Sequence, residues 1–111
     1  MYKRQRGSDA FEMMYRRYIK DDPARVASFQ EEMTKAEIAR EIYGLREQAG
    51  LTQEQLAELV GTDASVIDDI EEADYGGDFL AMASKIATAL QTRVEVHLIP
   101  IERNESVGAT A

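Results

Sequence analysis

The sequence predicts a mostly α-helical protein with one β-strand near its C-terminal end. Apolar residues recur at the i, i+3, i+4, i+7 spacing of a one-sided helix in several segments between residues 9 and 90. The clearest alternation of polar and apolar residues covers residues 93–98, and alternation is the period of a strand. The 111 residues can build one modest core, which leaves little room for a large catalytic cleft between two domains.

The composition favours a cytoplasmic protein without a cofactor. The chain contains no cysteine, so packing rather than disulfides or thiolate metal sites must hold the fold together. No stretch approaches the roughly 18 apolar residues that span a bilayer, and we expect no membrane partner. The formal net charge of -8 argues against loose, charge-driven attachment to nucleic acid.

Acidic residues are concentrated between Glu47 and Ser84. This stretch holds ten of the acids and no Lys or Arg. The acids are Glu47, Glu54, Glu58, Asp63, Asp68, Asp69, Glu71, Glu72, Asp74 and Asp78. So uneven a distribution predicts two faces with different partners, the alternative being a well-solvated acidic surface.

Residues 1–8 are predicted to form a flexible basic arm. The arm carries candidate contacts to DNA phosphates, the alternative being an ordinary solubilising tail; these residues are Lys3, Arg4 and Arg6. Farther along the chain, Arg16 and Arg17 would add to the same attraction. At the other end of the sequence, residues 101–111 are predicted to be a disordered tail.

Residues 9–33 are predicted to be an N-terminal helical extension. Asp9 is a suitable cap for a short first helix that runs to about residue 20. A second cap at Asp22, followed by a proline, starts a long helical pattern. Because a capping-box signal occurs at Thr34, residues 23–49 form either one long helix or two.

Residues 34–100 are predicted to form the main domain, and its best-marked helix follows Gly50. Thr52 is the expected cap of this helix, and Gln55 three residues later closes a capping box. The helix is expected to stop at Gly61, where glycine permits a tight turn. A second short helix is then expected to begin after residue 63.

This second helix has an apolar stripe and an acidic stripe. The inward residues are expected to be Val66, Ile67 and Ile70. The outward residues are expected to be Ser65, Asp68, Asp69 and Glu72. A capped helix, a glycine turn and a second helix within about 20 residues is the helix-turn-helix arrangement, in which the second helix enters the DNA major groove.

The domain is expected to end in one more helix and the strand. Asp78 is a suitable cap for that helix, whose core-facing residues are predicted to be Leu80, Ala83, Ile86, Ala87 and Leu90. The strand presents Val94, Val96 and Leu98 on one face. Since one strand cannot make a sheet, we expect it to pair with its copy in a homodimer, the alternative being an extended tail on its own domain.

Several short motifs of this sequence resemble those of the lambda-repressor/Cro-like (XRE) helix-turn-helix family. They are Leu45-Arg46, Gly50-Leu51-Thr52-Gln53, Leu56-Ala57, Val60-Gly61, Ile70-Glu71 and Ile86-Ala87. The run from Glu71 to Tyr75 and the run from Val94 to Pro100 are similar to the HigA-type antitoxin branch. The resemblance implies a lambda-repressor-like bundle and a dimeric repressor. In HigA-like members such a repressor also neutralises an RNase toxin of the HigB/RelE type.

The resemblance carries over unevenly to individual site residues. Thr52, Gln53 and Ser65 match positions that contact DNA, with Gln53 matching a phosphate-clamping glutamine. The departures from the family pattern are Asp63, Ala64, Asp68, Asp69 and Glu72. In place of a glutamine that would contact a base edge or phosphate, Ala64 offers a methyl group. Asp69 replaces a cation near phosphate, and each such reversal costs on the order of 1 kcal/mol.

Two functions are compatible with these residues. The first is a DNA-binding regulator that acts as the antitoxin of a HigBA-like pair. The alternative is a degenerate helix-turn-helix module whose acidic recognition helix binds a basic partner, such as an RNase toxin, and does not read DNA. An enzyme is not expected, because His97 is the single histidine and no nucleophile stands beside a base. A bound metal ion is not expected either, because helical acids without loop carbonyls make poor calcium sites.

Overall fold

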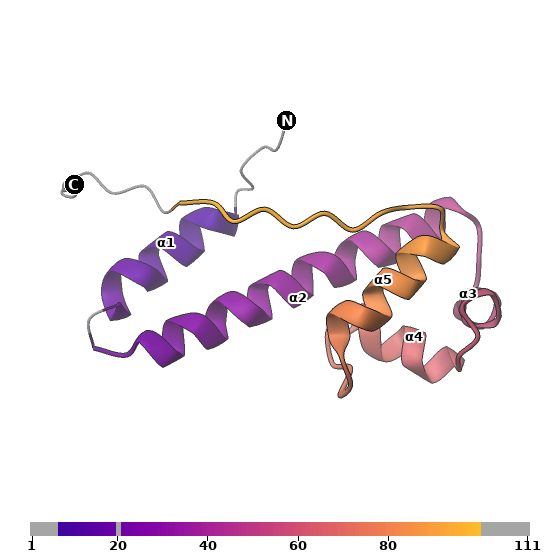
Figure 1. Cartoon of the computed structure of the whole chain (residues 1–111), viewed down its shortest axis with the longest axis horizontal. Coiled ribbons are helices and arrows are strands. Elements are labelled where there is room, and N and C mark those ends of the chain that lie inside the picture. Colours follow the sequence, from indigo (N-terminus) through magenta and orange to yellow (C-terminus); the bar gives the residue numbers. More distant parts are fainter. Residues whose placement is uncertain (1–6, 20, 101–111) are drawn as a thin grey trace.

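The computed structural model describes residues 7–19 and 21–100, and this part of the chain is mostly helical (Figure 1). Its helices are α1 (Gly7–Tyr18), α2 (Pro23–Gln48), α3 (Gln53–Val60), α4 (Ala64–Glu71) and α5 (Phe79–Ala89). The predicted basic-arm residues Lys3, Arg4 and Arg6 and the predicted tail 101–111 lie outside the described residues.

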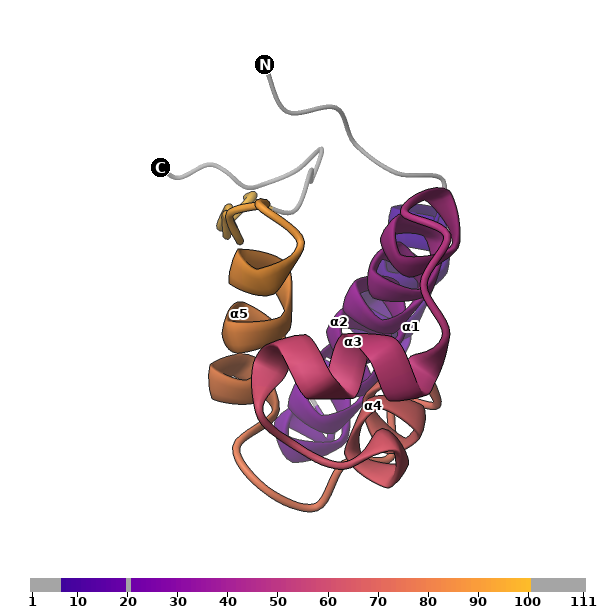
Figure 2. The same cartoon turned by 90° about the vertical axis from the view of Figure 1, so that its right-hand side faces the viewer.

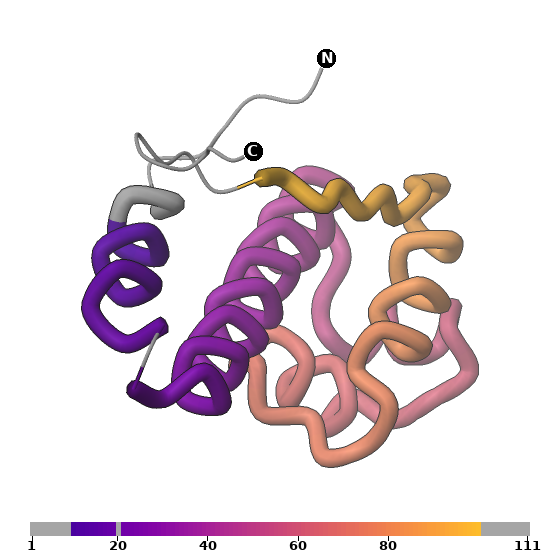
Figure 3. Tube along the Cα trace, turned by 60° about the vertical axis from the view of Figure 1, so that its left-hand side comes forward, coloured from indigo at the N-terminus to yellow at the C-terminus, as the bar shows by residue number. Residues whose placement is uncertain are grey.

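Helix α1 packs beside the N-terminal part of α2 (Figures 1 and 3). It begins at Gly7, so the prediction that Asp9 caps it was wrong, and Asp9 lies in its first turn. An acidic residue is favourable both as a cap and in the first turn, which is why the sequence signal did not separate the two. At the α1–α2 joint the Arg25 guanidinium lies 5.0 Å from the centroid of the Tyr18 ring.

Helix α2 is one continuous helix of 26 residues, which at 1.5 Å per residue is about 39 Å long. Its cap is Asp22, whose carboxylate accepts a hydrogen bond from the Arg25 N–H at 3.1 Å, and Pro23 occupies the first turn. The capping-box signal at Thr34 does not interrupt the helix. Buried residues on both sides of it, Val26 and Ala39 among them, keep α2 in contact with its neighbours along its length.

The core lies between the C-terminal half of α2 and helices α3, α4 and α5. It consists of Ile42, Leu56, Ala57, Ile67, Ile70, Phe79, Ala83 and Ile86. Figure 2 looks onto α3, with α5 on one side of it and α4 below. In this arrangement α4 is held on three sides, by α2, α3 and α5.

The prediction that Leu80 faces the core was wrong. Leu80 is 49% exposed, whereas Phe79 is 7% exposed and packs in the core. Asp78 caps α5 as expected, its carboxylate accepting from the Ala81 N–H at 3.1 Å. Phe79 and Leu80 both fit a helical stripe with residues 83 and 87, so spacing alone does not choose between them. The larger aromatic side chain is the one that is buried.

The predicted strand is absent from the described residues. Residues 93–100 leave the end of α5 and run back over α2 toward α1 without forming a helix or strand (Figures 1 and 3). A strand requires a neighbour to pair with, and none of the described segments offers one. Between this segment and helices α1, α2 and α5 lies a groove of about 1230 Å³, lined in part by Val94.

Candidate nucleic-acid interface

Helix α3 is capped and is joined to α4 by a tight turn, as predicted. The Thr52 hydroxyl accepts from the Gln55 N–H at 3.0 Å, and the Gln55 side-chain oxygen accepts from the Thr52 N–H at 2.9 Å. This closed capping box starts α3. Gly61 ends it with a left-handed φ of +84°, which glycine adopts without steric cost. The chain then enters α4 after Asp63, whose side chain makes no capping hydrogen bond.

A buried ion pair between Arg46 and Glu71 fixes α4 against α2. The Arg46 Nε donates to Glu71 Oε2 at 2.6 Å and its Nη2 donates to Glu71 Oε1 at 3.1 Å. Its Nη1 donates to the Leu51 carbonyl at 2.9 Å, which also ties down the turn before α3. The hydrogen bonds that Arg46 donates to Glu71 raise the pKa of the Arg46 guanidinium above its ordinary value, so this side chain stays charged.

Sequence reasoning missed this ion pair, although a signal for it exists. Arg46 follows Ile42 by one helical turn, so it continues the buried face of α2 where an apolar residue would be expected. A charged residue in such a stripe needs a partner of opposite charge. Glu71 is the candidate, because it directly follows the buried Ile70 at the end of α4.

The side-chain amide of Gln53 points at α4. Its Nε2 donates to Glu71 Oε1 at 3.0 Å and to Asp68 Oδ1 at 3.2 Å. Both partners are carboxylate oxygens that only accept, which also fixes the orientation of the amide. An amide nitrogen carries two hydrogens, and these two bonds use both. The family resemblance assigns Gln53 to a phosphate contact. In this structure both of its amide hydrogens are instead bonded to Asp68 and Glu71.

The outward face of α4 is exposed and negative. Three residues of α4 are exposed there, namely Ser65, Asp68 and Asp69, and so is the C-cap residue Glu72. Thr52 and Asp63 are exposed beside them, at the starts of α3 and α4. Ala64 is partly buried and packs against the core, so its methyl group is only partly available to a ligand. Of the ten acids between residues 47 and 84, all but Glu71 are exposed.

The cations of α1 lie away from this face. Arg16 and Arg17 are exposed near the end of α1, at the opposite end of the long axis from α3 (Figure 1). The Nη2 of Arg16 lies 3.9 Å from the Glu12 carboxylate, and the Arg17 guanidinium lies 5.6 Å from the Tyr18 ring centroid. The structure therefore does not bring these two cations to the α3–α4 surface.

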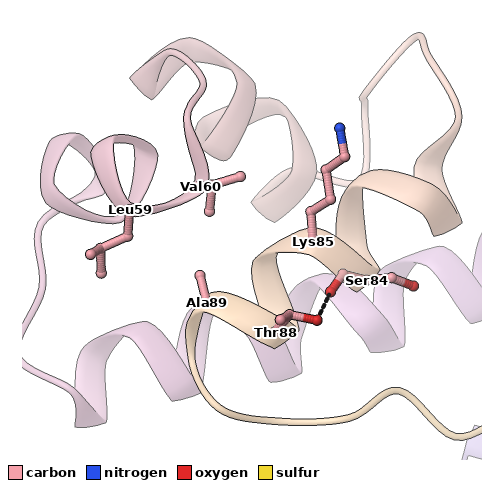
Figure 4. Close-up of a pocket in the computed structure, with 6 residues that line it drawn as sticks. All are labelled: Leu59, Val60, Ser84, Lys85, Thr88 and Ala89. Atoms are coloured by element: carbon pink, nitrogen blue, oxygen red, sulfur yellow. Dashed lines mark hydrogen bonds between the residues drawn. The ribbon is translucent and has the colours of Figure 1, made fainter.

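A shallow pocket of about 400 Å³ lies between the end of α3 and α5 (Figure 4). It is lined by Leu59, Val60, Ser84, Lys85, Thr88 and Ala89. The Thr88 hydroxyl donates to the backbone carbonyl of Ser84 at 2.9 Å, and the Lys85 side chain points away from this contact (Figure 4). This lining pairs no nucleophile with a base. Among the described residues, no group of three or more His, Asp or Glu side chains is placed to hold a metal ion.

Together, a capped helix, a glycine turn and a second helix with an exposed outer face define a helix-turn-helix protein. Residues 37–97, more than half of the chain, match the family model described as a helix-turn-helix domain, and the chain belongs to this family. Membership indicates a DNA-binding regulator. Comparison with curated proteins and with solved structures gave no significant match. No helix among the described residues is long and apolar enough to cross a membrane.

Proposed function

We propose that this chain is a cytoplasmic transcription regulator of the XRE type, and that it is the antitoxin of a HigBA-like pair. As a homodimer it represses its own operon and neutralises a basic RNase toxin. The observation that carries the DNA-binding part of the proposal is the α3–α4 pair. The Arg46–Glu71 ion pair holds α4 rigidly against α2, and the outer face of α4 is open to a major groove.

In this proposal the start of α3 contacts the DNA backbone and the start of α4 reads bases. Thr52 and Gln53 stand at the first positions of α3, where backbone N–H groups and the helix dipole favour a phosphate. Ser65, exposed in the first turn of α4, hydrogen-bonds a base edge. A phosphate contact by Gln53 requires its amide to leave the Asp68 carboxylate first.

A specific observation supports a second candidate, a protein-binding module that does not read DNA. The α3–α4 surface carries exposed acids without a Lys or Arg among them, and phosphates repel Asp68, Asp69 and Glu72. Two or three such repulsions cost several kcal/mol, comparable to much of the roughly 4–10 kcal/mol that separates specific from non-specific DNA binding. The same surface is complementary to a basic protein such as an RNase toxin.

The homodimer and the placement of its boundaries are part of the proposal. Residues 9–33 act as an extension and residues 34–100 as the DNA-binding domain, with α2 passing continuously from one to the other. The exposed apolar side chains of Val96 and Leu98 support a second copy as the partner of the C-terminal segment. Lys3, Arg4 and Arg6 are proposed to add phosphate contacts from outside the described residues.

A gel shift with the DNA upstream of the protein's own reading frame separates the two candidates. At low salt and with excess non-specific competitor, the regulator gives a retarded complex that Gln53→Ala and Ser65→Ala each weaken about tenfold. Thr88→Ala, on the pocket side of α5, serves as a matched control and leaves binding unchanged. Tight binding that survives both α3–α4 substitutions contradicts the assigned contacts.

No binding at any salt concentration favours the protein-binding module. In that case the same gel is repeated with the product of the neighbouring gene co-expressed. A small basic partner that co-purifies with the chain, and is released by Asp69→Lys, supports the second candidate. Co-purification that is indifferent to Asp69→Lys contradicts the use of the α4 face.

A further inference from the structure

The C-terminal segment of residues 93–99 carries an apolar stripe that is largely open to solvent. Val96 is 65% exposed and Leu98 is 91% exposed. Val94, two residues earlier, is partly buried at the groove beside α5. The segment forms one edge of the described molecule (Figure 1). Its first half is therefore anchored to the domain, and its second half lines the same groove but leaves its apolar side chains largely open to solvent.

The backbone of this segment is also available for pairing. The last backbone hydrogen bond that joins two described residues runs from the Thr92 N–H to the Ala87 carbonyl at 2.7 Å. Beyond it, the N–H and C=O groups of Val94, Val96 and Leu98 make no hydrogen bond to another described residue. An extended backbone with unpaired groups is a template for a second strand.

We propose that this segment pairs antiparallel with the same segment of a second copy, and that the two-fold axis passes through Val96. The inference rests on the homodimer of the proposed function and adds its register. Val96 then lies opposite Val96 of the second copy, and Val94 lies opposite Leu98 on the same face. On the other face Glu95 lies opposite His97 of the second copy, which sets a carboxylate against an imidazole.

The charges and the apolar stripe select this register. Within one chain the Glu95 carboxylate lies 3.3 Å from His97 Nε2 and accepts a hydrogen bond from Arg93 Nη2 at 3.1 Å. A two-fold axis through Glu95 would instead set the two Glu95 carboxylates opposite each other, and like charges directly opposite are destabilising. An axis through His97 would set the two imidazoles opposite each other and Glu95 opposite Ile99, which leaves the carboxylate without a polar partner across the ribbon. An axis between two residues would pair polar with apolar side chains on the same face.

The fold supplies the support that such a ribbon needs. A two-stranded ribbon alone is marginally stable in water. Here Val94 belongs to the lining of the groove that Ala83 and Ala87 of α5 also line, so each strand is backed by its own domain at one end. The same arrangement covers Leu98 with Val94 of the second copy, and the most exposed apolar side chain of the described chain is buried.

Cysteine cross-linking in the full chain tests the register, since the natural sequence contains no cysteine. Opposite residues of an antiparallel pair have Cα atoms about 4.5–5.5 Å apart, within the range that a disulfide bridges. Val96→Cys is expected to form a disulfide-linked dimer on mild oxidation. Glu95→Cys alone is not, because the two copies of residue 95 are then diagonal neighbours about 7–8 Å apart. An equimolar mixture of Glu95→Cys and His97→Cys is expected to cross-link.

Light scattering of the unmodified chain and of Leu98→Asp completes the test. The unmodified chain is expected to be a dimer, and Leu98→Asp is expected to raise the dissociation constant at least about tenfold. Leu59→Asp, at a position of α3 that is also exposed (61%, against 91% for Leu98), controls for added charge and leaves the dimer intact. A monomeric chain overturns both the homodimer and the register. A dimer that cross-links through Glu95→Cys alone, and not through Val96→Cys, overturns the register and leaves the homodimer standing.

Discussion

The Arg46 guanidinium and the Glu71 carboxylate form a two-point ion pair, at 2.6 and 3.1 Å, across 25 residues of sequence. Less than a tenth of either side chain is exposed. The second oxygen of this bond, Oε1, also accepts the Gln53 amide. One buried carboxylate thus joins α2, α3 and α4, and the orientation of the proposed recognition helix depends on it.

Removing one partner of this pair is expected to destabilise the fold strongly. Arg46→Met leaves the Glu71 charge buried and unpaired, which costs about 3–5 kcal/mol. The double variant Arg46→Met/Glu71→Leu buries no charge and is expected to be more stable than Arg46→Met. Urea denaturation of the four proteins in this cycle measures the difference. Equal stability of the single and double variants would show that the pair is not desolvated.

Replacing Ala73, just after α4, by glycine is expected to stabilise the fold. Ala73 has a left-handed φ of +57°, and its N–H bonds to the Ile70 carbonyl at 3.0 Å to close the helix end. A left-handed conformation costs an L-residue roughly 1–2 kcal/mol, so Ala73→Gly is expected to raise the unfolding free energy by about 1 kcal/mol.

Thermal or urea denaturation checks this prediction against a matched control. Ala81→Gly changes an exposed alanine inside α5 and is expected to lower stability by up to about 1 kcal/mol. The same sign for both substitutions would mean that position 73 is not held in the left-handed conformation.

The Tyr75 ring covers Gly77 so closely that a side chain there is expected to displace it. A Cβ atom at residue 77 would lie 2.8 Å from Cε2 of Tyr75, whereas a Cβ at Gly76 would meet no atom within 4 Å. Gly77→Ala is therefore expected to cost about 1–2 kcal/mol through this crowding. Gly76→Ala is the control and is expected to be near neutral.

Combining the substitution with Tyr75→Ala isolates the contact. In the Tyr75→Ala background the obstructing ring is gone, and Gly77→Ala is expected to cost almost nothing in urea denaturation. A penalty that persists in that background would place its origin in the backbone rather than in the ring.

The bond between Gln53 and Asp68 predicts a variant that binds DNA better. Asp68→Ala removes a negative charge from the outer face of α4 and releases one Gln53 amide hydrogen for a phosphate. We expect affinity for the upstream DNA to rise about tenfold at low salt. Fluorescence anisotropy with labelled DNA measures it.

A variant with the same change in net charge separates the effect of the α4 surface from the effect of the overall charge of the protein. Glu32→Ala changes the net charge equally from an exposed site in the N-terminal half of α2 and is expected to alter affinity by less than about twofold. Equal gains from both variants would attribute the effect to net charge alone.

Local signals in the sequence predicted the helix starts and turns around the site. The capping box at Thr52, the cap at Asp78 and the turn at Gly61 all form as expected, because each depends on residues within one turn of the chain. The same local reasoning placed the start of α1 incorrectly and left α2 undecided, since tertiary packing overrides a single capping signal.

Contacts between distant segments were the part that sequence did not predict. The Arg46–Glu71 ion pair and the hydrogen bond from Gln53 to Asp68 depend on how α2, α3 and α4 pack together. The spacing of residues along the chain does not determine this packing. The choice between Phe79 and Leu80 depends in the same way on the rotation of α5 about its axis. The predicted strand required a neighbour that is not among the described residues of a single chain.

A titration of the isotopically labelled protein with its upstream DNA, followed by amide chemical shifts, tests the central claim most directly. The claim is that the start of α3 and the outer face of α4 form the contact surface. The largest shift changes are expected at Thr52, Gln53 and residues 64–69. Changes confined to other helices, or none at any protein-to-DNA ratio, would contradict the assignment of this helix pair as the DNA-binding unit.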